Sequence, residues 1–548
     1  MNKNEIKKES GSYYTPDILA DFIAYHLFST YSFDKNISIL EPSAGDGIFF
    51  ESIFNNQLFK NRFKLPEKIS ILAVEKETKA IEQMKTRIKT FITGQTNIKY
   101  LNKDYLEFQT QNKEKFDLVI GNPPYIKSQH LTGKQIKLCT NLHKKFELQD
   151  KSIKNIWTSF LLGAVASLNE NGVLCFVLPA ELLQVIYAKE LRELLRSSFD
   201  RIEIFTFNEL IFPEIEQDVI ILICSNGREP GVSFYHVEKL NDLREPTFTR
   251  DHSNIHRQTL DKWTNYILSD SELEFLDSLR EKLLPIKSYC KAEVGIVTAA
   301  NDYFIVNNST LRESGITGIA RPILQKGSFA PSSLRFKKTD YRNIVTADKS
   351  AFFLAFQNKG KSGFSNSIKK YLKKGEDLNI HKRYKCQLRQ KWYFVPSTWV
   401  SDGFFTKRSN LFPRVMINDA QTIVTDAFYR IEMKAGNNIK DLTYSFYNTL
   451  TFIFSELEGR YYGGSVLELT PNEFKNLSIP YKENVSRVEL DRLDKLLKNK
   501  ASVTDILNDT DTTILKEKLG LSKTQILRLR RIYERLVKRR LKSLKSRF

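Results

Sequence analysis

The feature that most constrains the fold is an alternation, between residues 36 and 225, of short apolar runs with stretches of helical spacing. The apolar runs are as long as strands, and residues 153–168 and 180–195 carry apolar side chains at intervals of three and four. This alternation predicts βαβ units and a doubly wound α/β domain. The expected strands are residues 37–40, 69–74, 116–120, 173–178, 202–205 and 219–224.

The positive net charge of the chain limits the classes of partner that we expect it to bind. Its 548 residues include 84 Lys and Arg against 64 Asp and Glu, a formal net charge of +20. The expected partner is therefore a polyanion, with nucleic acid first and an anionic membrane surface second. A hydrophobic content of 41% excludes wholesale disorder. No apolar run approaches the roughly 18 residues of a membrane span, and the amino terminus lacks the apolar stretch of a secretory signal.

The cysteines indicate the compartment. There are five, scattered along the chain, with no CxxC pair and no clustered histidines. This pattern favours a reducing, cytoplasmic setting and gives no zinc site, so we expect no metal cofactor.

A change of composition marks the domain boundaries. After Asn226-Gly227 the strand–helix rhythm gives way to segments in which aromatic and basic residues interleave. We expect a first domain at residues 1–238, a second at 239–486 and a basic helical segment at 487–548. Residues 515–548 alone carry 13 Lys and Arg against 2 Asp and Glu.

The end of the first expected strand indicates a ligand site. Residues 40–47 read Leu-Glu-Pro-Ser-Ala-Gly-Asp-Gly and stand between a strand and a helical stretch. Small residues there let the backbone approach a ligand at the carboxyl edge of a parallel sheet. The spacing lacks the third glycine of a dinucleotide-binding loop, so a plain tight turn remains an alternative for this loop alone.

Carboxylates follow the next two strand regions. Glu75 ends the second, where it can accept hydrogen bonds from both hydroxyls of a ribose. Asp104 follows the third and can accept from the exocyclic amine of an adenine. Glu75 or Asp104 alone is typical of a solvated acid in a loop. Their order after successive strands, however, predicts a pocket for an adenosyl group.

The most specific motif is Asn-Pro-Pro-Tyr at residues 122–125, directly after a strand. The Asn122 side-chain oxygen and the Pro123 carbonyl are two acceptors for one planar NH2 group, and the prolines restrict the backbone that carries them. Tyr125 offers a ring face to the base that bears the amine. A strand-ending turn would explain the prolines but neither the Asn nor the aromatic residue.

With these motifs the chain resembles the adenine-N6 DNA methyltransferases of the gamma class, the Taq type, of restriction-modification systems. Residues 13–16 look like their motif X, residues 41–47 like motif I, Glu75 like motif II, and residues 104–105 and 122–125 like motifs III and IV. The resemblance implies a Rossmann-like class I fold that binds S-adenosylmethionine (AdoMet). It also implies a mixed α+β target-recognition domain behind that fold, followed here by the basic helical segment.

Later segments continue the resemblance. Residues 156–160 and 172–179 look like the later sheet motifs, and Phe212-Pro213 is similar to the segment whose phenylalanine stacks on the flipped base. Residues 295–298, 413–415 and 459–471 look like parts of the specificity domain of the same group.

The resemblance also implies roles for individual residues. The catalytic residues would be Asn122, Pro123, Pro124 and Tyr125, and Tyr125 and Phe212 would stack on the target base. The implied cofactor-binding residues are Tyr13, Thr15, Glu41, Pro42, Ser43, Ala44, Gly45, Asp46, Glu75, Lys76, Asp104, Tyr105 and Asn122.

Basic and aromatic residues interleave in the second domain. Residues 369–391 carry nine Lys and Arg against two acids, which suits a surface that grips a DNA backbone or, alternatively, a solvated basic face. In the terminal segment Leu529, Ile532 and Leu536 have helical spacing, so we expect one helix face to pack on the protein, the rest gripping DNA or being solvated. The expected DNA contacts are Lys382, Arg383, Lys385, Arg389, Arg460 and Tyr461.

The resemblance implies an enzyme that methylates N6 of an adenine flipped out of duplex DNA, in the cytoplasm of a prokaryote. We expect a monomer, with any cognate endonuclease on a separate chain. Two enzymatic alternatives share the motif, because an RNA base or a protein glutamine also presents a planar NH2 group. The non-enzymatic alternative is a DNA-binding specificity module.

Overall fold

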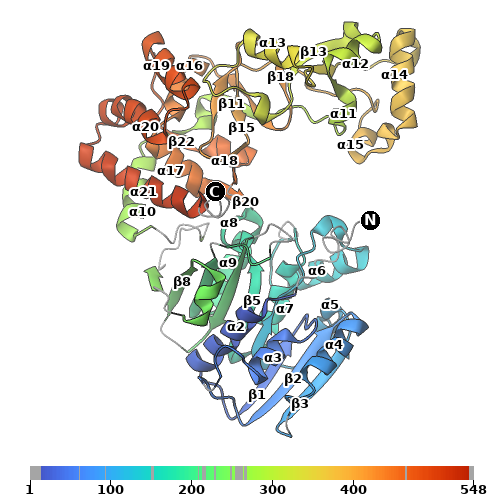
Figure 1. Cartoon of the computed structure of the whole chain (residues 1–548), viewed down its shortest axis with the longest axis vertical. Helices are drawn as coiled ribbons and strands as arrows, with labels where there is room; N and C mark the ends of the chain where they lie inside the picture. Colours follow the sequence, from blue (N-terminus) through green and yellow to red (C-terminus); the bar gives the residue numbers. More distant parts are fainter. Residues whose placement is uncertain are drawn as a thin grey trace. The chain divides into compact units, whose positions relative to one another are not determined.

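The structure, a computed structural model, describes residues 14–60, 62–92, 94–149, 153–207, 209–212, 218–227, 230–246, 250–253, 263, 268–462 and 466–541. The chain divides into two compact units (Figure 1). Unit 1 comprises Met1–Asp270 with Tyr462–Gly464 and Leu541–Phe548, and unit 2 comprises Ser271–Tyr461 and Ser465–Arg540.

Unit 1 is built on one nine-stranded sheet in the order β3-β2-β1-β4-β5-β7-β6-β8-β9. The strands β1 to β5 run parallel to their neighbours, whereas β7 lies antiparallel between β5 and β6. The strands are β1 (Asn36–Glu41), β2 (Lys68–Glu75), β3 (Thr96–Asn102), β4 (Phe116–Gly121), β5 (Leu168–Pro179), β6 (Arg201–Phe207), β7 (Val219–Ser225), β8 (Gly231–Val237) and β9 (Arg250–Ser253).

Six of the helices of unit 1 fall into two packed groups, α2 to α4 and α5 to α7, and α8 packs against α9. Apolar side chains of the sheet and of both groups form a single core. The helices are α2 (Asp17–Thr30), α3 (Ile48–Phe54), α4 (Thr78–Ile88), α5 (Tyr105–Gln109), α6 (Gly133–Lys145), α7 (Trp157–Ala166), α8 (Glu181–Gln184) and α9 (Lys189–Ser198). All six strands expected from the apolar runs are present, and the α/β class is confirmed.

Two details of the expected fold were wrong. The predicted helix at residues 180–195 is broken, because Val185 is extended (ψ 147°) and the buried Arg192 guanidinium bonds the carbonyls of Leu182 and Val185. The predicted helix at residues 153–168 begins only at Trp157, because residues 154–156 bond instead to residues 126–128. Both differences arise from tertiary hydrogen bonds that local spacing does not encode.

Unit 2 contains two four-stranded sheets, in the orders β11-β19-β15-β17 and β12-β14-β13-β18. The first consists of β11 (Cys290–Val294), β19 (Phe428–Met433), β15 (Gly403–Thr406) and β17 (Val415–Ile417), and the second of β12 (Ile305–Val306), β14 (Phe352–Leu354), β13 (Ala320–Leu324) and β18 (Ile423–Val424). The smaller pieces are a pair, β10 (Leu284–Pro285) and β22 (Ser478–Ile479), and a three-stranded sheet of β16 (Arg408–Ser409), β21 (Val466–Glu468) and β20 (Arg460–Tyr462).

Helices complete unit 2. They are α10 (Asp270–Arg280), α11 (Asn301–Phe304), α12 (Asn308–Glu313), α13 (Lys338–Thr346), α14 (Asn366–Asp377), α15 (Tyr384–Gln387), α16 (Ile439–Phe446), α17 (Thr449–Glu458), α18 (Pro471–Asn476), α19 (Arg487–Lys498), α20 (Val503–Asp511) and α21 (Lys523–Leu541), with a π-helix at Thr512–Lys518. Gly295, after β11, approaches another backbone so closely that a Cβ would lie 2.1 Å from the Thr425 carbonyl oxygen. Only glycine fits there.

Residues 487–540 of the basic carboxy-terminal segment are mostly helical and belong to unit 2. Leu529, Ile532 and Leu536 of α21 are buried, as their spacing predicts. Two of its arginines also face inward: Arg530 pairs with Asp511, and Arg540 pairs with Glu456. Part of the charge in this segment therefore stabilises unit 2 itself.

Two features are absent from the described residues. Within that part of the chain, no helix is both long and apolar enough to span a membrane. The same residues also include no group of three or more His, Cys, Asp and Glu side chains arranged to hold a metal ion.

Candidate active site

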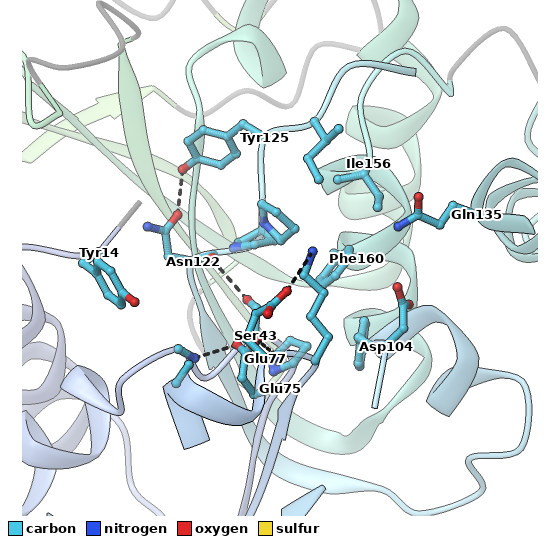
Figure 2. Close-up of a pocket in the computed structure, with 18 of the residues that line it drawn as sticks. Tyr14, Ser43, Glu75, Glu77, Asp104, Asn122, Tyr125, Gln135, Ile156 and Phe160 are labelled. Atoms are coloured by element: carbon cyan, nitrogen blue, oxygen red, sulfur yellow. Dashed lines mark hydrogen bonds and ion pairs between the residues drawn. The ribbon is translucent and has the colours of Figure 1, made fainter. Parts of the chain in front are cut away.

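A cavity of about 500 Å³ opens at the carboxyl ends of β1, β2 and β4 (Figure 2). Parallel strands collect at this edge the loops that follow them, so residues distant in sequence share one site. Predicted site residues that line the cavity are Pro42, Ser43, Gly45, Glu75, Lys76, Asp104, Tyr105, Asn122, Pro123, Pro124 and Tyr125.

The loop after β1 is fastened to the end of β2. The Gly45 backbone N–H donates to Glu75 Oε2 at 2.9 Å, and the Glu77 N–H donates to Glu75 Oε1 at 2.9 Å. Gly45 and Gly47 have φ of 54° and 83°, a backbone region that favours glycine. The Glu75 carboxylate is thus held in place, and each oxygen keeps a second lone pair for a ligand.

Glu41, the last residue of β1, lies buried beside this loop rather than on the cavity wall. It is 1% exposed, and its Oε2 has no hydrogen-bond partner among the described residues. Burial, reinforced by the charges of Asp46 and Glu75, raises the pKa of Glu41 well above its usual value. A buried acceptor without a donor is costly, so this carboxyl favours a ligand with a cationic or hydrogen-bond-donating group.

The Asn122 side chain is oriented by two neighbours. Its Oδ1 accepts from the Tyr125 hydroxyl at 2.9 Å, and its Nδ2 donates to Thr15 Oγ1 at 3.3 Å. The Tyr125 hydroxyl also lies 3.0 Å from the Val177 carbonyl, so these two acceptors share its one proton. Burial raises the pKa of Tyr125, which keeps the phenol protonated as the donor. Figure 2 shows Tyr125 above Asn122 at one side of the cavity.

The side of the cavity formed by α5 and α7 combines one acid with aromatic rings. Asp104 caps α5, with Oδ1 accepting from the Leu106 N–H at 2.8 Å. Next to it the Tyr105 ring lies 4.9 Å from the Phe160 ring, measured between centroids. Among the described residues nothing bonds Asp104 Oδ2, which leaves an acceptor beside an aromatic surface suited to a planar ring.

Several lining residues were missed. Ile156, the residue before α7, and Phe160 of its first turn are four residues apart, a spacing that could have assigned both to one helix face. Lys79 and Gln83 are one turn apart on α4, where exposed polar residues carry no distinguishing signal. The other missed residues are Tyr14, Glu77, Ala80, Ile126 and Gln135.

Other predicted residues do not line the cavity. Thr15, Ala44 and Asp46 lie around it, with Asp46 in an ion pair with Arg87 at 2.6 Å. Phe212 is buried in the core of unit 1, and its stacking role stays a prediction. Tyr13 lies outside the described residues.

The predicted DNA contacts in unit 2 differ in their surroundings. Lys382 and Lys385 are exposed, whereas Arg383 donates to the Ala299 carbonyl at 3.0 Å. Arg389 is turned inward onto backbone carbonyls, and Arg460 pairs with Glu473 at 3.0 Å. The Tyr461 side chain lies outside the described part of the structure.

The strand order, the antiparallel β7 and an Asn-Pro-Pro-Tyr loop at the carboxyl edge of the sheet define a class I methyltransferase. The sequence model "Eco57I restriction-modification methylase" matches residues 31–212, and the model of the C-terminal domain of the Type II methyltransferase M.Eco57I matches residues 260–515. With both domains matched in order, the chain belongs to the Eco57I restriction-modification methylases.

Individual relatives agree with this membership. The chain is 26% identical over 494 residues to the Type II methyltransferase M.AccI of Acinetobacter calcoaceticus, covering 86% of this chain and 85% of the relative. It is 26% identical over 220 residues to M.BanIII of Aneurinibacillus aneurinilyticus, covering 37% and 36%. The fold is similar to that of the Type IIL restriction-modification enzyme MmeI, solved in complex with DNA, with a TM-score of 0.62, 13% identity and coverage of 98% and 80%.

Proposed function

We propose that this chain is the modification enzyme of a Type II restriction-modification system and transfers a methyl group from AdoMet to N6 of an adenine flipped out of duplex DNA. Membership of the family supports DNA methylation. The observation that carries the choice of an exocyclic amine is the Asn122 side-chain oxygen next to the Pro123 carbonyl on the cavity wall. These groups accept hydrogen bonds, and a primary amine has two to donate.

The residues of the cavity fit AdoMet. A volume of about 500 Å³ lies within the roughly 300–1,000 Å³ of small-molecule pockets. The held Glu75 carboxylate suits the ribose hydroxyls, and Asp104 with Phe160 suits the adenine amine and ring. The unpartnered oxygen of Glu41 supports a ligand with positive charge. AdoMet, when bound, supplies an electrophilic methyl group on a sulfonium.

The residues of the chain supply positioning and charge stabilisation. Asn122 Oδ1 and the Pro123 carbonyl accept from the two N–H groups of N6, which turns the nitrogen lone pair toward the methyl. The same acceptors stabilise the positive charge that develops on nitrogen during transfer, and the proton leaves afterwards. The Tyr125 ring faces the base and offsets part of the few kcal/mol that flipping costs.

The test replaces the proposed acceptor. Asn122→Ala should abolish transfer of tritiated methyl from AdoMet to duplex DNA while AdoMet binding, followed by calorimetry, stays within about threefold of wild type. The matched control Asn437→Ala, at an exposed turn far along the sequence, should keep full activity. Equal loss of transfer and of cofactor binding would refute the catalytic role.

The substrate class is tested with the same assay. Duplex DNA should accept methyl, and nuclease digestion followed by mass spectrometry should find N6-methyladenine. Transfer to RNA or to a glutamine-containing peptide in its place would favour the enzymatic alternatives. N4-methylcytosine would leave the family intact and refute the choice of adenine.

The proposal extends to the oligomeric state of the enzyme and to a partner endonuclease. We propose that the enzyme acts as a monomer in a bacterial cytoplasm and that a separate endonuclease recognises the same site. Light scattering should give the mass of one chain. Extracts of the source cells should cut unmethylated DNA at the site that this enzyme protects.

A further inference from the structure

The short helix α15 (Tyr384–Gln387) presents two large apolar side chains to solvent. Tyr384 is 74% exposed and Leu388 is 69% exposed. The Leu388 N–H donates to the Tyr384 carbonyl at 3.3 Å, so the two residues stand one turn apart on the same face. A tyrosine beside a leucine forms an apolar patch rather than a single exposed residue.

The opposite side of α15 is firmly anchored. Cys386 is fully buried, and the half-buried Arg389 donates to the carbonyls of Val297 and Thr298 at 2.8 Å each. Arg383 adds a bond to the Ala299 carbonyl at 3.0 Å. Figure 1 shows α15 beside α11, which follows these carbonyls in the chain. Tyr384 and Leu388 are therefore exposed on a fixed support and not on a loose loop.

A second cavity adjoins this patch. It measures about 510 Å³ and is lined by Tyr384, Arg383 and Lys385, by residues 297–301 and by Asp426. Its wall includes Ala299, whose φ of 66° is unusual for a residue with a Cβ and marks a turn that its surroundings hold in place. The apolar patch thus stands at a preformed hollow.

The charge around the patch is mostly positive. Lys382 and Lys385 are exposed next to Tyr384, and Asp426 is the one acid that lines the cavity among the described residues. The two acids in the basic run are already paired, Glu376 with Lys361 and Asp377 with Lys373. Such a surface attracts a polyanion, while its centre offers an aromatic and an aliphatic side chain.

We propose that Tyr384 and Leu388 read the recognition sequence by contacting bases in a groove of the DNA, while Lys382 and Lys385 hold the flanking phosphates. This proposal rests on duplex DNA being the substrate. Phosphates are bound by cations and N–H groups, whereas an aromatic ring and a leucine suit base faces and the thymine methyl. The anchoring of α15 matters because base contacts give specificity only from a rigid support.

The experiment selects bound duplexes from a pool of randomised 30-base-pair DNA, using the full chain, and sequences them. The wild type should enrich one motif, and Tyr384→Ala should lose the preference at one or two adjacent positions, weakening binding to the selected duplex on the order of tenfold. Leu388→Ala should affect the same or a neighbouring position. Val488→Ala, a similarly exposed (72%) apolar residue of unit 2, is the matched control and should change nothing.

Salt dependence separates the two kinds of contact. Lys382→Ala and Lys385→Ala should each lower the slope of log affinity against log salt by about 1 and keep the motif, whereas Tyr384→Ala should keep the slope. An unchanged motif in Tyr384→Ala, a reduced slope in that variant, or no enriched motif in the wild type would overturn the proposal. Because the readout is binding, loss of methyl transfer in the wild type refutes the proposed function without deciding this result.

Discussion

At the scale of single residues, the site is organised by hydrogen bonds within the chain itself. The Asn122 amide is held between Tyr125 and Thr15, and the Glu75 carboxylate is held by two backbone N–H groups. Groups fixed in this way lose little freedom when a ligand binds. The cavity is therefore preorganised at the positions where we propose that the amine and the ribose sit.

The motif residues at this scale were largely predictable from sequence. Asn122, Glu75 and Asp104 follow strands of a parallel sheet, and that topology alone brings their loops to one edge. The burial of Phe212 and the isolation of Glu41 Oε2 were not predictable. Both depend on which atoms of distant segments pack around these side chains, and residue order does not contain that information.

Glu41 gives a prediction about pH. Because burial raises the pKa of the Glu41 carboxyl above its usual value of 4.5, the ligand-free folded chain keeps a proton at pH values just above 4.5, where the unfolded chain has released it. The contribution of this carboxyl to stability is therefore present at low pH and lost as pH rises above about 4.5 and through the raised pKa. Glu41→Gln should remove this dependence, so the stability of the wild type relative to the variant should fall with rising pH in urea titrations.

The variant Glu41→Gln also tests whether the ligand of the cavity carries a positive charge near this carboxyl. A cationic ligand favours the carboxylate form of Glu41, so AdoMet binding by the wild type should release a proton, measured by calorimetry in two buffers of different ionisation enthalpy. Glu41→Gln should abolish the release and weaken AdoMet binding about 10- to 100-fold. Wild-type affinity and an unchanged proton release in Glu41→Gln would show that Glu41 does not respond to the cofactor.

At the scale of elements, the basic helix α21 contributes a buried ion pair to the core of unit 2. The Arg540 guanidinium (0% exposed) bonds the Glu456 carboxylate (1% exposed) and the carbonyls of Asn410 and Leu411. A buried pair of this kind is costly to break, because removing one partner leaves the other charge uncompensated. The helix is thereby fixed to α17 by its last described turn.

Arg540→Met should therefore lower the free energy of unfolding by about 3–5 kcal/mol, measured by urea denaturation of the full chain. Arg540→Met combined with Glu456→Gln should recover part of that loss, since no buried charge then remains alone. Arg531→Met, at an exposed position of the same helix, is the control and should stay within about 0.5 kcal/mol. A loss no greater than that of the control would show that the pair does not stabilise the helix.

The helices and strands also show which structural features the spacing of apolar residues can predict. It placed six of the nine described strands of unit 1 and the buried face of α21, because each depends on one repeating contact surface, but it did not place β3, β8 or β9. It did not place the break at Val185, where a guanidinium from the next helix satisfies carbonyls that a continuous helix would have used itself. Nor did it distinguish Arg389 and Arg460 from the exposed Lys382, because charge alone does not reveal a partner.

At the scale of the whole molecule, the count of 84 Lys and Arg overstates the number of cations available to DNA, because some of them pair with acids inside the fold. Three arginines of α21 form ion pairs within unit 2: Arg530 with Asp511, Arg540 with Glu456 and Arg535 with Glu272. Arg531 and Lys538 line a hollow along α21, together with the paired Arg535 and Glu272. The segment is thus first a structural part of unit 2, whatever it adds to DNA binding.

Deletion of residues 519–548 tests whether α21 stabilises unit 2. It removes the buried Leu529, Ile532 and Leu536, so unit 2 should unfold at lower urea concentration, while AdoMet binding by unit 1 should persist. Circular dichroism and cofactor calorimetry measure the two effects separately. Retention of the full urea midpoint would contradict a structural role for α21, and the charge variants Arg531→Ala and Lys538→Ala would then report its contribution to the salt slope.

The two carboxylates beside the loop after β1 also bear on the exchange of cofactor and product. Glu41 and Glu75 lie within electrostatic reach of each other, in a setting that favours positive charge. In the proposed reaction, methyl transfer turns a sulfonium into a neutral thioether, so the positive charge that these carboxylates favour is lost. We therefore expect the site to bind AdoMet more tightly than the demethylated product, so that product inhibition is weak.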